Sequence, residues 1–259
     1  MNESVEQQVD GSLEVAPGVH RFGSERVNWY VVETDGRLLV VDAGLPAHWD
    51  QLVEWLVLRG YVLDDIAALV LTHGDPDHIG FAERLRATAG VPVLVHEADA
   101  GLVRGTDGGQ SAGDLVSMVA DAWRPPVLKL YVELWRAGGS SIPPVESVET
   151  FEDGDVLDVP GQPRVIHVPG HSPGTCALFL PDRDILLCGD ALATIDLRTG
   201  RADGPQLMAM FNDDRAQALE SLAELETLGT VVLLPGHGGQ WRGEMSAAVR
   251  LARERDDTS

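Results

Sequence analysis

Four side chains that can bind a metal ion fall within six consecutive positions of this sequence. They follow an apolar run, residues 66–71, which is too short for a helix and predicts a buried strand. After them, apolar residues recur at helical spacing from Ile79 onward. The intervening glycine and proline favour a sharp turn, so the side chains can converge on one point. The pattern therefore predicts a metal site on a strand-to-helix loop, rather than an ordinary polar loop, with His73, Asp75, Asp77 and His78 as ligands.

Four further short motifs accompany this stretch: Val40–Gly44, Pro169–Gly174, Gly189–Asp190 and Pro235–Gly238. Five motifs in this order resemble those of the metallo-β-lactamase-fold metallo-hydrolase superfamily, and the resemblance spans most of the chain. It implies an α/β fold, an αββα sandwich in a single domain over residues 1–259, with ligands at strand ends. Because this fold hosts many reactions, the resemblance indicates the fold and the metal site more strongly than any substrate.

The resemblance also implies a dinuclear metal centre. Each metal would have two histidines and one aspartate as ligands: His73, Asp75 and His171 for the first, Asp77, His78 and His237 for the second, with Asp190 bridging the two. A hydroxide shared by the metals would be the nucleophile, since coordination can lower the pKa of water from about 15.7 to about 7. Asp77 would orient that nucleophile or carry a proton to the leaving group.

Asp75 departs from the family pattern, His-x-His-x-Asp-His, by replacing the second histidine. A third carboxylate makes the site formally neutral and adds an oxygen ligand. Zinc is the metal expected first, and the oxygen ligand brings in iron or manganese as alternatives. A different interpretation is that the shorter side chain does not reach, which would leave the first site weak or empty. Asp42 could accept an imidazole N–H or simply cap the turn after its strand.

Three classes of function compete. The first is a hydrolase that cleaves a small ester, thioester or lactone, because the residues that activate water are all present. The second is an iron-dependent oxidoreductase of the persulfide dioxygenase kind, in which a lone iron would use the positions of His73, His171 and Asp190. The third, a metal-stabilised binding protein without turnover, is disfavoured by the intact second trio. β-Lactamase activity is disfavoured by the neutral site and by the lack of an obvious lysine anchor.

Composition limits the partners. Forty-one acidic residues against nineteen basic ones give a net charge of −22, which repels nucleic acid, so a small-molecule substrate is expected. Residues 1–12 lack the basic start and apolar core of a secretory signal, and no apolar run approaches the length of a bilayer span. We therefore expect a cytoplasmic protein with no membrane partner; a homodimer is left open. Cys176 and Cys188 lie in apolar runs and are expected in the core.

The ligands must be positioned by strands that end next to them. Strands are predicted over residues 37–42, 66–71, 91–96, 156–159, 164–168, 175–180, 184–188 and 231–234, and helices over residues 49–60, 115–123, 126–137 and 247–255. A further helix is expected after a cap at Asn212 or Asp213. Residues 37–43 and 184–191 share a shape, an apolar strand that ends at an aspartate, which is a faint internal repeat.

Residues 97–150 interrupt this alternation of strands and motifs. We interpret them as a helical cap inserted between the second and third motifs, and residues 1–12 as a disordered tail. Val127, Tyr131, Leu134 and Trp135 form an apolar stripe that would either face the active site or pack in the core. His96, at the start of the insertion, could face the pocket, whereas His167 is expected to be structural.

Overall fold

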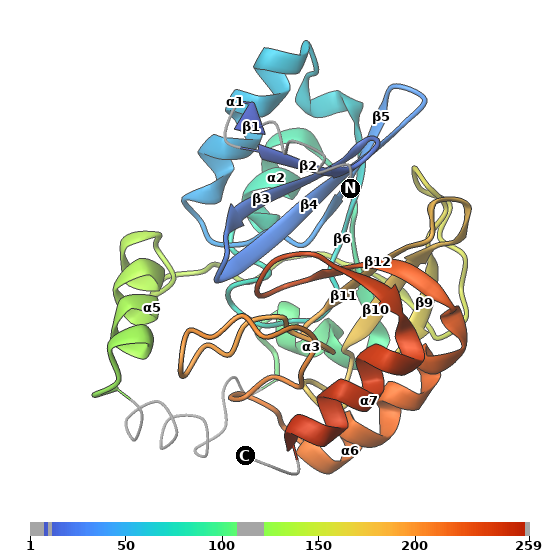
Figure 1. The fold of residues 1–259 in the computed structure, drawn as a ribbon. Helices are drawn as coiled ribbons and strands as arrows, with labels where there is room; N and C mark the ends of the chain where they lie inside the picture. The colour runs from blue at the N-terminus through green and yellow to red at the C-terminus, as the bar shows by residue number, and fades with distance from the viewer. Residues whose placement is uncertain (1–7, 10–11, 108–121, 257–259) are drawn as a thin grey trace.

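The computed structural model of the chain describes residues 8–9, 12–107 and 122–256. Two β-sheets face each other across an apolar core, and helices cover the outer face of each sheet (Figure 1). This is the predicted αββα sandwich, an α/β fold. In the described part of the chain, no helix is long and apolar enough to cross a membrane.

The first sheet contains eight strands in chain order. They are β1 (Gln8–Val9), β2 (Ser12–Ala16), β3 (Val19–Ser24), β4 (Val27–Thr34), β5 (Arg37–Val41), β6 (Ile66–Val70), β7 (Val93–His96) and β8 (Glu149–Phe151). Pairing is antiparallel from β1 to β5 and parallel from β5 to β8. The carboxyl ends of β5, β6 and β7 therefore lie at one edge, where loops can bring polar side chains together.

The second sheet has the order β13-β12-β11-β10-β9. Its strands are β9 (Arg164–His167), β10 (Cys176–Leu180), β11 (Ile185–Gly189), β12 (Thr230–Pro235) and β13 (Trp241–Glu244). Only the β11–β12 pair is parallel. Because β10 runs against both β9 and β11, the strands β9, β11 and β12 all point the same way.

Helices cover each sheet from outside. The first sheet carries α1 (His48–Arg59) and α2 (Ala82–Ala89), with the 3₁₀ turn η1 (Leu63–Asp65) between them. The second carries α6 (Arg215–Ser221), the 3₁₀ helix η4 (Leu222–Leu228) and α7 (Met245–Asp256), and η3 (Pro181–Arg183) joins β10 to β11.

The central strands are buried on both faces. In β5, Leu39 and Val41 face the second sheet, while Leu38 and Val40 pack beneath the helices. Successive side chains of a strand point to opposite faces, so a run of apolar residues fills both layers. This explains why β5 and β6 read as continuous apolar segments in the sequence.

The insertion contains η2 (Glu97–Asp99), α3 (Ala100–Val103) and α5 (Pro125–Arg136). Figure 1 shows α5 standing beside the sandwich rather than within either helical layer. The helix predicted over 126–137 begins one residue earlier, since proline fits the first turn, where its missing N–H costs nothing. The helix predicted over residues 115–123 lies mostly outside the described residues.

Two local predictions were wrong. Residues 156–159 do not form a strand, because Val156 makes only an isolated bridge to Arg164 within a loop that turns at glycines. The cap of α6 is Asp214, whose carboxylate accepts the N–H of Gln217, not Asn212 or Asp213. The tail expected over residues 1–12 lies mostly outside the described residues; of its positions, Gln8–Val9 form β1 and Ser12 begins β2.

Candidate metal centre

The seven predicted ligands meet at one edge of the sandwich. Four of them occupy the loop after β6, and the other three follow β9, β11 and β12. All of these strands end at this edge, so residues up to 164 positions apart in the sequence become neighbours there. The structure thus brings together every residue predicted to bind metal: His73, Asp75, Asp77, His78, His171, Asp190 and His237.

Asp190 lies at the centre of the group. Its Oδ2 is 2.9 Å from His237 Nε2 and 3.5 Å from His171 Nε2. The same oxygen is 3.9 Å from His73 Nε2, and Oδ1 is 3.4 Å from His78 Nε2. One carboxylate therefore faces all four imidazoles.

Two three-residue groups flank Asp190, and in each the potential ligand atoms lie within 4.8 Å of one another. We call His73, Asp75 and His171 the first triad, and Asp77, His78 and His237 the second triad. Asp75 Oδ2 is 3.1 Å from His171 Nε2 and 3.8 Å from His73 Nε2. The aspartate that replaces the usual histidine thus extends far enough to join the first triad.

Unpartnered donor atoms indicate that the group suits a cation. His73 and His78 are fully buried, and within the described residues their Nε2 atoms have no hydrogen-bond partner. Asp190 Oδ1 is buried in the same way. A buried polar atom without a partner costs free energy, and divalent zinc, iron or manganese would satisfy a mixed set of nitrogen and oxygen donors.

Burial and neighbouring charges shift the pKa values of the histidines and of the shared aspartate, some upward and some downward. Burial and the neighbouring His78 lower the pKa of His73 to about 3, so its imidazole is neutral. Burial opposes charge on His171 as well, but its hydrogen bond with Asp75 and the charges of Asp75 and Asp190 raise its pKa to about 9. Burial would raise the pKa of Asp190, yet the charges of His237 and His78 hold it well below its usual value.

Asp42, at the end of β5, orients one histidine of each triad. Its Oδ2 is 2.9 Å from His78 Nδ1, and it accepts a hydrogen bond of 2.9 Å from the Thr72 hydroxyl. Since that hydroxyl proton points to Asp42, the Thr72 oxygen can accept the N–H of His73 Nδ1, 3.0 Å away. Both imidazoles then carry hydrogen on Nδ1 and turn Nε2 toward Asp190. The proposed contact from Asp42 to an imidazole is present.

The faint repeat between β5 and β11 has a geometric counterpart. Each strand is followed directly by an aspartate, and both aspartates contact the imidazole of His78. Asp42 faces its Nδ1 atom, and Asp190 faces its Nε2 atom. The residue directly after β12, Gly236, lies so close to Asp190 that a larger side chain would not fit there. A Cβ on Gly236 would lie 2.2 Å from Asp190 Oδ1.

Asp99 was missed by the sequence analysis. This buried carboxylate accepts N–H groups from Gly74 at 2.9 Å and Gly174 at 2.6 Å, and the Ser172 hydroxyl at 2.6 Å. It therefore joins the loop that carries His73 and Asp75 to the loop that carries His171. The available signal was positional: Asp99 follows β7, which is parallel to β6 and ends at the same edge.

Two residues of β4 hold the loop that carries His237. The Asn28 side chain donates to the carbonyls of Pro235 at 2.9 Å and Gly238 at 2.7 Å. The Tyr30 hydroxyl donates to the Pro235 carbonyl at 2.6 Å. The Nδ1 of His237 contacts the Arg26 carbonyl. The second triad is thereby tied to the first sheet.

A pocket of about 310 Å³ opens over the cluster. Its floor includes Asp75, Asp77, His171, Asp190 and His237, and its walls are mainly apolar. Four residues of α5 contribute to these walls: Leu130, Tyr131, Leu134 and Trp135. The predicted apolar stripe therefore serves both expected roles. Val127 is fully buried and does not line the pocket, whereas Trp135 lines the pocket and is 71% exposed.

The remaining histidines and cysteines lie elsewhere. His96 does not line the pocket, contrary to one expectation; it stacks on His167 with ring centroids 4.1 Å apart. Cys188 packs in the core beneath α6 and α7, as expected, and both cysteines are free and buried.

Comparison with known proteins identifies relatives over most of the chain. The family model of the metallo-beta-lactamase superfamily matches residues 23–237. The probable metallo-hydrolase YflN of Bacillus subtilis (strain 168) is 30% identical over 239 residues, covering 87% of this chain and 86% of YflN. The acyl-coenzyme A thioesterase MBLAC2 of Gallus gallus is 30% identical over 233 residues, covering 85% of this chain and 75% of MBLAC2. The structure of TTHA1623, solved in a di-iron-bound form, matches with a TM-score of 0.61 and 26% identity, and the match covers 90% of this chain and 96% of TTHA1623.

Proposed function

Because this chain belongs to the metallo-beta-lactamase superfamily, we propose that it is a dinuclear metal-dependent hydrolase that cleaves a thioester. The observation that carries the proposal is Asp190, which lies between two triads on the floor of a largely apolar pocket. Thioesters are favoured over other esters and lactones because one relative is an acyl-coenzyme A thioesterase.

The ligand assignment follows the two triads. His73, Asp75 and His171 would hold one cation, Asp77, His78 and His237 the other, and Asp190 would contact both. When bound, the cations would supply Lewis acidity and a water molecule of lowered pKa. Zinc is proposed first; iron is the alternative because Asp75 adds an oxygen donor and TTHA1623 is known in a di-iron-bound form.

The chain's own residues would bind the substrate and move a proton. Asp77 lines the pocket, its side chain is 24% exposed, and its Oδ2 is 3.6 Å from His237 Nε2. It is the carboxylate to which we assign the transfer of a proton to the departing sulfur. Leu45, Ile142 and Phe211 offer the apolar wall against which an acyl chain would pack.

An iron-dependent dioxygenase is the second candidate. Its support is the compact trio His73, His171 and Asp190, in which Asp190 Oδ2 lies 3.9 Å and 3.5 Å from the two Nε2 atoms. A lone iron at these residues would leave the second triad without a catalytic role.

The test combines metal analysis with activity. Purified protein is assayed for metal content, for hydrolysis of matched thioester, lactone and phosphoester panels, and for oxygen uptake with persulfide. We expect about two metal equivalents and thioester hydrolysis without oxygen consumption. Oxygen uptake with one iron per chain would favour the dioxygenase and contradict the hydrolase.

A further inference from the structure

A second pocket, of about 490 Å³, lies beside the candidate active site. We call it the arginine pocket because its lining includes Arg124, Arg198, Arg215 and Arg255. All four arginines are half-buried. They come from different parts of the chain: Arg124 precedes α5, Arg198 lies in the loop after β11, Arg215 begins α6 and Arg255 lies near the end of α7.

The charge of this pocket is opposite to that of the protein. The chain carries −22 overall, with only nineteen basic residues, yet four of them line this one pocket. Among the described residues that line the pocket, the acidic ones are Asp196 and Asp256, so four positive charges less two negative ones leave a formal +2 for this part of the lining. Such a concentration in an acidic protein indicates a site that attracts anions.

The two aspartates are engaged in the structure of the walls. Asp196 Oδ1 accepts the backbone N–H of Arg198 at 2.8 Å, and Oδ2 accepts the Thr199 hydroxyl at 2.7 Å, so this carboxylate forms its own turn. Asp256 pairs with Arg215. Arg255 donates to the Gly204 carbonyl at 2.7 Å and also contacts the Asp203 carbonyl, so it supports the same loop.

One wall separates the arginine pocket from the candidate active site. At both ends of residues 196–209, neighbouring side chains line different pockets. Leu197 and Met208 line the active-site pocket, whereas Arg198 and Ala209 line the arginine pocket. The backbone bridges Ala193–Gln206 and Asp196–Arg201 hold this segment together. The two pockets therefore share this segment as a common wall.

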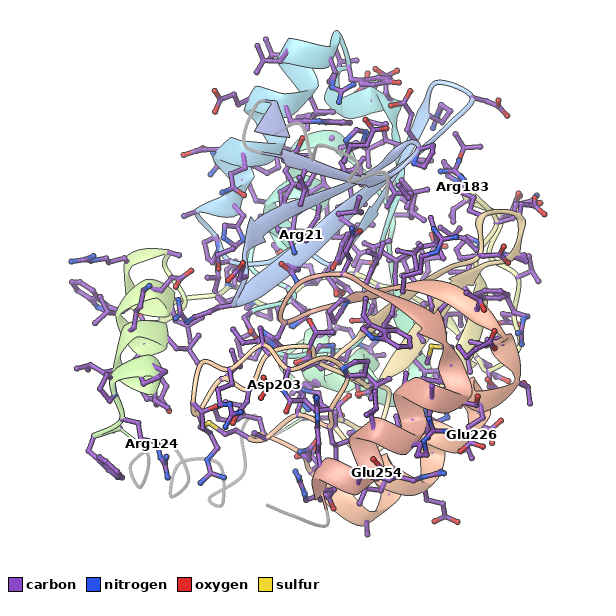
Figure 2. The ribbon with its side chains drawn as sticks, in the orientation of Figure 1. Arg21, Arg124, Arg183, Asp203, Glu226 and Glu254 are labelled. Atoms are coloured by element: carbon purple, nitrogen blue, oxygen red, sulfur yellow. The ribbon has the colours of Figure 1, made fainter. Side chains whose placement is uncertain are left out.

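The helix α5 runs past both pockets. Arg124, immediately before its first residue, lines the arginine pocket, and Leu134 and Trp135 near its other end line the active-site pocket. Figure 2 labels Arg124 at the end of α5 and Asp203 in the loop that faces it. Six residues separate Arg124 from Leu130 and eleven separate it from Trp135, which is a helix rise of about 9 to 16 Å. A substrate that reaches both pockets along α5 must therefore span a distance of about this order.

We propose that the arginine pocket binds the phosphate groups on the thiol half of a coenzyme A thioester, while the acyl carbonyl lies over the seven-residue cluster. This rests on the proposed thioesterase function and names its substrate class. Phosphate oxygens accept paired N–H groups from arginine, and a long flexible arm separates the phosphates of coenzyme A from its sulfur. A small ester or lactone would use the first pocket alone.

The test compares two thioesters of the same acyl chain, one of coenzyme A and one of phosphate-free N-acetylcysteamine. In R198Q, we expect the ratio of kcat/KM for the coenzyme A ester to that for the short thioester to fall about tenfold, mainly through KM. R198K, which keeps the charge, should fall less. The matched control R250Q removes an arginine of α7 whose side chain is 64% exposed, and its ratio should equal that of the wild type.

Equal losses on both thioesters in R198Q, or an equal change in R250Q, would overturn the proposal. A binding arm separates it from the proposed function. Calorimetry of the full-length protein with ADP should show salt-dependent binding that R198Q weakens, and inorganic phosphate should bind less tightly. Phosphate binding as tight as that of ADP would reduce the pocket to an ion site and overturn the substrate class. If neither thioester is hydrolysed but R198Q weakens ADP binding, the phosphate pocket stands and the proposed function fails.

Discussion

The two triads differ in how the surrounding protein supports them. In the second triad, both imidazoles have their Nδ1 atoms engaged, His78 with Asp42 and His237 with the Arg26 carbonyl. Asn28 and Tyr30 fasten the loop of His237 to β4. The hydrogen bonds that hold the two histidines of this triad therefore come from residues in, or next to, β4 and β5.

The first triad depends on loops. Within the described residues, His171 Nδ1 has no hydrogen-bond partner, and the Asp75 side chain is 29% exposed. The main connection between its two loops is Asp99. The second site is therefore the more rigid of the two. Because ligands that are already fixed lose less conformational entropy when a metal binds, we expect the metal of the first triad to dissociate more readily.

The largest expected effect comes from removing one ligand of each triad. His171→Ala and His237→Ala should each reduce activity by more than about a hundredfold, because a lost ligand costs at least as much as a lost supporting contact. Neither change opens a large apolar cavity, so circular dichroism and thermal melts should show a retained fold. Metal analysis should find H171A deficient in the first cation only. Folded variants with full turnover would disprove the ligand assignment.

Replacing the two supporting carboxylates is expected to cost about 10- to 100-fold in metal affinity. Asp99→Asn should weaken the first triad, because an amide cannot accept all three hydrogen bonds. Asp42→Asn should weaken both triads, since Asp42 contacts His78 directly and His73 through Thr72. Metal titrations measure both, with the exposed neighbour variant Glu97→Gln as the control. If D99N weakened metal binding at both triads as much as D42N does, the proposed difference in how the two triads are supported would be wrong.

Asp75→His tests the chemical difference between the triads. A histidine here raises the formal charge of the site by one unit and adds a nitrogen donor. Zinc should then gain occupancy relative to iron or manganese, and the acidic limb of the pH–rate profile should move to lower pH. Metal content and pH profile are measured on the same samples. If both sites remain filled while neither quantity changes, Asp75 is not a ligand.

Proton release should reveal the environment of His171. Its pKa is raised to about 9, so the imidazole is protonated near neutral pH and must lose its proton to bind a cation. Metal affinity should therefore rise with pH up to about 9 and then level off. Asp75→Asn removes a major cause of the raised pKa and should make this dependence shallower. Calorimetry in buffers of different ionisation enthalpy would measure the proton released when the metal binds. A metal affinity that does not change from roughly pH 6 to pH 8 would contradict the expectation.

The smallest effect is expected at Cys188. Its thiol is buried in the core under α6 and α7 and contacts the Leu192 carbonyl at 3.3 Å, outside both triads. Cys188→Ala should cost about 1 kcal/mol of stability and leave the metal content unchanged. Denaturant melts and metal analysis check this. Loss of one metal equivalent would show that the thiol is a ligand after all.

The sequence predicts the parts of this protein whose signals are local. The candidate ligands in the loop after β6 can be recognised from their spacing and from the glycine and proline between them, and short apolar runs locate β5, β6, β11 and β12. Asp99 carries no such signal, because its importance comes from two loops that the fold brings to it. The arginine pocket likewise depends on four residues spread from position 124 to position 255. Residues 156–159 have a strand-like pattern, but beside β9 they make only the isolated bridge between Val156 and Arg164.

The most direct test of the dinuclear centre is anomalous scattering from crystals of the metal-loaded protein, collected at the absorption edges of zinc and iron before and after brief exposure to a chelator. We predict two peaks on either side of Asp190, one within each triad. The peak at His73, Asp75 and His171 should lose occupancy first, while the peak at Asp77, His78 and His237 persists. A single peak in the loaded crystals, or a first-triad peak that outlasts the second, would contradict the picture of two unequal sites that share one carboxylate.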